Sequence, residues 1–325
     1  AERSRPKVAG GVMVGARILA VCVVMAAAVL PAAANPFLIE APQPEYTSTF
    51  ALRYWYGMGE TKGTLYDFSG STMYSRLTYD GMKSHAAEVF FRVDGTESSL
   101  FFKGYAGGGL LAHGNLQDED FPPAISPYSS TNSSLQNQGL GYLSIDVGGA
   151  LLRGADFRID GFVGYHWLNE NMKAFGCTQT ATNTSVCTPS VSDSTAVIQQ
   201  QNNWQSLRLG LNADLPISDR FRINLDAAWL PYVWFKGQDT HYLRINTGNV
   251  GDFSGPIPED GHGWGYQLEA VLTYKFDNNF ELGVGWRYWH MQSNGYAHFE
   301  NVIIGANGGS QVMDWKTDRY GIFLQ

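Results

Sequence analysis

Apolar and polar side chains alternate with a period of two along much of the chain after residue 49. This is the period of a β-strand, in which successive side chains point to opposite faces. The segment 206–215 sets four leucines and an alanine on one face against Ser206, Arg208 and Asp214 on the other. We therefore predict an all-β chain of ten strands. The segments that show the alternation are 50–57, 87–93, 99–111, 143–151, 157–167, 206–215, 221–242, 264–275, 280–288 and 314–325.

The polar face of these segments carries charged residues on nearly every strand. A soluble sandwich would bury that face, and a buried unpaired charge costs several kcal/mol. The apolar strips often end in Trp or Tyr, as in the aromatic girdle of a membrane barrel. Short turns such as 95–97 and 217–219 alternate with long polar stretches such as 113–136 and 237–262. We predict a ten-stranded antiparallel transmembrane β-barrel with long extracellular loops, located in the bacterial outer membrane.

The N-terminus has the pattern of an export signal. Basic residues precede the apolar run 18–30, and small residues follow it. The run is shorter than the roughly 20 residues that a membrane helix needs. We expect a signal peptide at 1–34 and a barrel domain at 35–325. Residues 1–12 are an upstream extension if translation starts at Met13.

Composition excludes one class of partner. The formal net charge is −8 and only 16% of the residues are charged. No basic cluster rises above the background, so nucleic acid is not an expected partner. Outer-membrane lipid is the partner that the barrel prediction implies.

Two cysteines, Cys177 and Cys187, remain after the predicted signal, in a segment rich in Thr, Ser and Asn. An exported protein enters an oxidising compartment, which favours a disulfide that closes a loop. A metal site is the competing interpretation, but no histidine lies nearby to complete it. Histidines 262, 290 and 298 fall towards the last outer loops, where a metal site is a weaker alternative. No metal is predicted.

Two acidic motifs stand at the outer ends of predicted strands. Asp239 and His241 end the segment 221–242, and Asp118 and Asp120 follow the third strand. Residues two apart on an extended backbone point to the same side, so each motif forms a pair. Neighbouring carboxylates raise each other's pKa and can hold a water. A solvated loop is the plain alternative for either motif alone.

Strict alternation raises a difficulty for the Asp-His pair. Along 221–242 it turns odd-numbered residues towards lipid. Asp239 and His241 must therefore lie above the bilayer, or beyond a β-bulge that switches faces.

The stretch GNLQDEDF at 114–121 resembles the signature of the omptin family, and 221–242 resembles the strand that ends in the family's Asp-x-His-Tyr. Weaker similarity covers 59–62, 75–79 and 157–165. The resemblance touches most of the chain after residue 34. It implies a ten-stranded outer-membrane endopeptidase that cuts peptides or proteins in a groove above the membrane, facing the exterior.

The resemblance assigns catalysis to four residues. Asp239 would orient His241, which takes a proton from water. Asp118 and Asp120 would position that water from the opposite wall. The expected enzyme is thus an omptin-type aspartic endopeptidase that needs no cofactor, with lipopolysaccharide as a candidate activator. We expect it to be a monomer.

Two positions depart from the family pattern. Relatives that cut between basic residues carry acids at the positions matching Gly63 and Gly237. Without those charges, an Arg or Lys of the substrate loses its salt-bridge partners. A broader or different specificity is predicted for this substrate-binding pocket. The basic residues that bind lipopolysaccharide phosphates in the family also lack a match near 164–175.

A non-enzymatic barrel is the main alternative, because function does not follow from fold. Such a barrel would act as an adhesin or a small pore. A lipid-modifying barrel enzyme would require a Ser/His site near the lipid boundary, and no such arrangement stands out in the sequence.

Overall fold

The computed structural model describes residues 45–325 except 122–125, 155–156, 278, 301 and 306–307. These residues fall in one compact unit, 44–325. The predicted signal peptide at 1–34 lies outside the described residues. Within the described part of the chain, no helix is long and apolar enough to cross a membrane.

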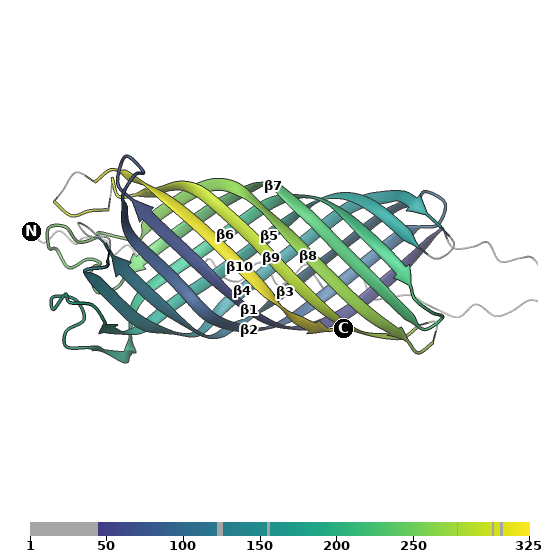
Figure 1. Ribbon diagram of the computed structural model, residues 1–325, viewed down its shortest axis with the longest axis horizontal. Helices are drawn as coiled ribbons and strands as arrows, with labels where there is room; N and C mark the ends of the chain where they lie inside the picture. The colour runs from purple at the N-terminus through teal and green to yellow at the C-terminus, as the bar shows by residue number, and fades with distance from the viewer. Residues whose placement is uncertain (1–44, 122–125, 155–156, 278, 301, 306–307) are drawn as a thin grey trace, which may run out of the picture. The chain divides into compact units, whose positions relative to one another are not determined.

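Ten antiparallel strands form a closed barrel (Figure 1). Each strand pairs with its sequence neighbours, and β1 pairs with β10 to complete the ring. The predicted fold class is confirmed. The strands are β1 Tyr46–Tyr66, β2 Met73–Gly95, β3 Leu100–Asp120, β4 Ser129–Arg153, β5 Arg158–Gln179, β6 Val191–Pro216, β7 Phe221–His241, β8 Ile257–Lys275, β9 Glu281–His298 and β10 Ser310–Leu324.

The strands extend further than their alternating segments predict. Much of the polar stretches 113–136 and 237–262 is paired strand, and the connections themselves are 121–128 and 242–256. Polar residues on both faces resemble a loop in sequence, yet the backbone ladder continues through them. A strand of the length of β7, 21 residues, tilted by about 45°, rises about 50 Å. That exceeds the roughly 30 Å of a bilayer core, so the barrel projects well beyond it.

The outer surface marks where the membrane lies. On β7 the outward residues Trp229 and Trp234 are exposed aromatics, whereas Lys236 and those above it are polar. On β3 the outward face changes in the same way, from Leu110 to His113. An apolar band thus covers one part of the barrel, and the strand ends that carry the acidic motifs lie outside it.

Ion pairs fill the lumen inside the apolar band. Arg53 lies 3.0 Å from Glu88 and 3.2 Å from Glu269. Arg287 lies 2.6 Å from each of the same two carboxylates. All four residues come from different strands, so the network ties β1, β2, β8 and β9 together across the barrel interior. Mutual neutralisation is what allows these charges to be buried.

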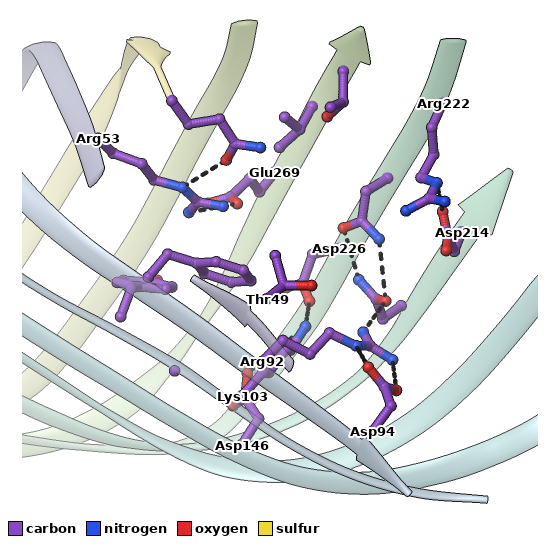
Figure 2. Close-up of a pocket in the computed structure, with 18 of the residues that line it drawn as sticks. Thr49, Arg53, Arg92, Asp94, Lys103, Asp146, Asp214, Arg222, Asp226 and Glu269 are labelled. Carbon is purple, nitrogen blue, oxygen red and sulfur yellow. Dashed lines mark hydrogen bonds and ion pairs between the residues drawn. The ribbon is translucent and has the colours of Figure 1, made fainter. Parts of the chain in front are cut away.

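A chamber of about 300 Å³ adjoins this network and is also lined by charged residues (Figure 2). Figure 2 shows Arg92 paired with Asp94, and Lys103 beside Asp226. Arg92 contacts Asp94 at 2.8 Å and Asp160 at 2.6 Å. The cations of the chamber are therefore held by carboxylates of the same lumen.

An aromatic layer blocks the lumen. Trp55, Tyr142 and Trp289 are buried, with ring centroids 4.9, 5.2 and 5.4 Å apart. The Arg287 guanidinium lies over Trp289, 5.1 Å from its ring centroid. The middle of the barrel is therefore packed with side chains.

Replacing Arg287 by Met should lower the free energy of unfolding by about 3–5 kcal/mol, because Glu88 and Glu269 would each lose one of their arginine partners in the interior. Urea-driven unfolding in lipid vesicles measures this change. Arg222→Met is the matched control, since the side chains of the Arg222–Asp214 pair are 47% and 33% exposed, so solvent screens the pair and it should contribute about 1 kcal/mol or less. Equal losses in the two variants would contradict a stabilising role for the network.

Candidate functional site

Strand β7 changes face at Pro231 and Tyr232. Ala228 and Leu230 point inward before this point, and Val233 does so after it. The ladder to β8 skips from Leu230 to Val233, as expected for a β-bulge with one extra residue in β7. Proline has no N–H to donate, so an irregular ladder position suits it.

The bulge resolves the difficulty that strict alternation raises. After it, odd-numbered residues of β7 face the lumen, among them Gly237 and Asp239. The pair also lies beyond the apolar band. Both solutions foreseen from the sequence are therefore present.

Strand β3 also changes face before its acidic motif. Tyr105 and Leu111 point inward at odd positions, whereas Leu116 is buried at an even one. The register to β2 shifts in the same region, between Lys83 and Ser84. As a result, Asp118 follows Leu116 on the inner face.

The two motifs meet across the barrel. Strands β4, β5 and β6 separate β3 from β7 on one side, and five strands separate them on the other. Asp118, Asp120, Asp239 and His241 nevertheless line one cavity of about 500 Å³. The structure thus brings together all four predicted catalytic residues.

Asp239 and His241 form a hydrogen-bonded pair. The distance from His241 Nε2 to Asp239 Oδ2 is 2.8 Å, and Asp239 is buried. Burial by itself lowers the pKa of His241, but the charge of Asp239 and its hydrogen bond outweigh burial and raise that pKa above the ordinary value. The imidazole therefore gains a proton readily near neutral pH.

Asp118 and Asp120 are half-buried neighbours on β3. Burial, together with the negative charge of Asp120, raises the pKa of Asp118 to about 7. Burial also raises the pKa of Asp120, against a hydrogen bond from Ser75. The raised pKa values favour a protonated carboxyl group in this site near neutral pH, and Asp118 is the group whose pKa lies there.

Two loops are joined beside the histidine. In the connection between β7 and β8, Ser254 N–H donates to Val302 O at 2.7 Å, in the connection between β9 and β10. In the opposite direction, Ile304 N–H donates to Asp252 O at 2.8 Å. The ring of Phe253 lies between them, 5.6 Å from that of His241. Backbone hydrogen bonds thus hold this side of the cavity.

The disulfide between Cys177 and Cys187 is present, with Cα atoms 5.6 Å apart. It joins the end of β5 to the connection before β6, and both cysteines line the cavity. The predicted bond and its role in closing a loop are confirmed.

Side chains from neighbouring strands fill the space beside both pocket glycines. Gly237 pairs with Glu259, and a Cβ on Gly237 would lie 2.2 Å from Glu259 Oε2. Gly63 pairs with Trp315, and a Cβ on Gly63 would lie 2.6 Å from the indole ring. Sequence reasoning missed Glu259 and Trp315, because cross-strand partners depend on a register that the bulges shift.

A family profile described as Protochlamydia outer membrane protein, Pom, matches residues 105–321, more than half of the chain. The chain belongs to the Protochlamydia outer membrane protein family. The matched range contains both acidic motifs. No curated protein sequence matches the chain.

A solved structure of another barrel has a similar fold. The outer membrane protease OmpT from Escherichia coli matches with a TM-score of 0.62 and 16% identity, over 85% of this chain and 95% of that chain. The likeness of fold confirms the predicted resemblance to omptins. The toluene transporter TbuX of Ralstonia pickettii covers 84% of this chain and 88% of its own, at 9% identity and a TM-score of 0.29. Family and fold support an outer-membrane location for this Pom-family barrel.

Replacing Asp118 by Asn should stabilise the barrel more at high pH than at low pH. The folded-state pKa, about 7, exceeds the unfolded value of about 3.9, so the stability contributed by the protonated acid is lost as the pH rises through about 7. We expect a gain of about 1–3 kcal/mol near pH 9 relative to pH 5. Urea unfolding at both pH values measures it.

The control for this prediction is Asp219→Asn, in the exposed turn before β7, which should change stability little at either pH. An Asp118→Asn effect that is the same at both pH values would contradict the raised pKa.

Proposed function

We propose that this Pom-family barrel is an outer-membrane endopeptidase that cuts peptides or proteins by activating water. The observation that carries the proposal is the single cavity with an Asp-His pair on one wall and an Asp-Asp pair on the other. The omptin-like fold supports the same conclusion only at the level of architecture.

The roles of the Asp-His pair follow from its hydrogen bond. His241 uses Nε2 towards Asp239, which leaves Nδ1 to accept a proton from water. Asp239 orients the ring and stabilises the imidazolium that forms. The imidazolium then returns the proton to the leaving amine when the tetrahedral intermediate collapses, so no residue is acylated.

The Asp-Asp pair holds the attacking water. Because the pKa of Asp118 is about 7, one member of the pair can carry a proton near neutral pH while the other is ionised, so the pair both accepts and donates a hydrogen bond. The ionised member accepts from the water, and the protonated member can donate to the carbonyl oxygen as negative charge develops there. Two walls that contact the water from opposite sides fix its direction of attack.

The proposed site faces the cell exterior. It lies beyond the apolar band at the end with the longer connections, such as 242–256, whereas the turn 217–220 closes the other end. Outer-membrane barrels place their longer loops outside. We retain the monomer as the proposed state and lipopolysaccharide as the proposed activator.

The packed lumen speaks against a pore. Trp55, Tyr142 and Trp289 fill the barrel between the cavity and the charged chamber. Planar-bilayer recordings should show no conductance steps. An adhesin would bind peptides without cutting them, which the next measurement separates from an enzyme.

Replacing His241 by Ala should lower kcat/KM by at least about 10²-fold, because the general base is lost. The measurement is cleavage of a fluorogenic peptide mixture by the protein refolded with and without lipopolysaccharide. His262→Ala, which removes an outward ring stacked on Tyr232, is the matched control and should retain activity. Unchanged turnover by the His241→Ala variant would contradict the proposed mechanism.

Replacing Asp239 by Asn should move the acidic limb of the pH profile of kcat/KM to lower pH. The base acts when neutral, so activity rises as the pH passes the pKa of His241. The charge of Asp239 raises that pKa, and its removal lowers it. A profile from about pH 5 to 9 for both proteins measures the shift. A limb that stays in place would show that the titrating group is not His241.

A further inference from the structure

The cavity continues past the catalytic pairs along a wall with little charge. Its side chains come from strands β1, β2, β8, β9 and β10 and from the residue after β9. Leu77 pairs across the ladder with Asp118, and Ile257 pairs with Asp239. The wall therefore begins beside both catalytic pairs. Its apolar members are Leu65, Leu77, Ile257, Ala297, Phe299 and Met313.

Glu259 carries the carboxyl group on this side of the cavity, and it is buried and hydrogen-bonded within the protein. Glu259 is 4% exposed, and Gln200 Nε2 donates to its Oε2 at 2.6 Å. The same oxygen fills the space beside Gly237. A cation entering from the cavity would have to displace that hydrogen bond before it could pair with the carboxylate.

The remaining charges at the rim are already paired with each other. Arg244 lies 3.1 Å from Asp252 and its guanidinium lies 4.5 Å from the ring centroid of Phe253. Arg244 also lines the cavity, so it opposes the entry of a basic side chain.

We propose that this apolar wall is the pocket for a bulky aliphatic or aromatic side chain next to the scissile bond. The inference rests on the proposed function. A Leu, Met or Phe side chain leaves water for an apolar surface at the wall, which is favourable. A Lys or Arg side chain loses hydration against these apolar side chains, which offer it no hydrogen-bond acceptor, and this is unfavourable. The cavity volume, about 500 Å³, is in the range of side-chain and small-ligand sites.

The test is a peptide library with one variable position, incubated with the refolded full chain. The wild type should cleave beside Leu, Met or Phe at least about 10-fold faster than beside Lys or Arg. Ala297→Phe adds a ring to the wall and should shift the Leu-to-Ala ratio of cleavage rates towards Ala by about 10-fold. Met313→Ala enlarges the pocket and should shift the cleavage preference towards Trp. This second variant tests the proposal even if Ala297→Phe fails to fold.

The Glu259→Gln variant distinguishes between an apolar and an acidic substrate pocket. The ratio of Leu to Lys cleavage should stay unchanged in this variant, because the proposal assigns side-chain recognition to the apolar wall, and the Glu259 carboxyl group is held by Gln200. Preferred cleavage beside Lys or Arg that disappears in Glu259→Gln would overturn the apolar pocket and leave the protease proposal standing. Unaltered preferences in folded Ala297→Phe and Met313→Ala variants would also overturn it. A wild type that cuts no peptide at all would instead defeat the proposed function.

Discussion

The strict alternation of side chains between the two faces of each strand is the constraint on which this barrel depends. In a closed sheet each side chain faces either the lumen or the outside, and only an extra residue in a strand can exchange the two faces. The lower part of β7 needs Trp229 facing lipid, whereas the upper part needs Asp239 facing the cavity. Pro231 and Tyr232 supply the exchange. Without it, an uninterrupted alternating strand would turn the buried carboxylate of the Asp-His pair outwards.

The packed lumen gives the cavity its floor. Arg53 and Arg287 neutralise Glu88 and Glu269, and the aromatic layer lies against this network. Breaking one such pair is costly in a dry interior, so the network favours one arrangement of the strands around it. The open part of the lumen above then keeps a fixed shape, which a water-activating site requires. The charged residues on the inner face of the strands, which indicated a membrane barrel in the sequence, therefore also help to fix the shape of the cavity.

Local patterns in the sequence predicted the fold and picked out the two acidic pairs that line one cavity, because period-two alternation and Asp-x-His spacing need no partner strand to be recognised. The disulfide between Cys177 and Cys187 was also predictable without a partner strand, because an exported protein enters an oxidising compartment. Strand ends were harder, since polar upper strands such as the last third of β7 have the composition of loops. Glu259 and Trp315 escaped prediction because their places beside Gly237 and Gly63 depend on register across strands. Register depends in turn on bulges, whose positions alternation alone does not give.

The position of the quartet on strand ends also explains how the site tolerates its own repulsion. Burial raises the pKa of both Asp118 and Asp120, and the charge of Asp120 adds to the rise at Asp118. A loop could relieve the strain by moving the carboxylates apart. Strand β3 cannot do so without breaking its ladders to β2 and β4, so burial and repulsion appear as a raised pKa of Asp118 instead of a displacement. The same rigidity that lowers stability at high pH therefore favours a protonated Asp118 near neutral pH, which the proposed mechanism uses.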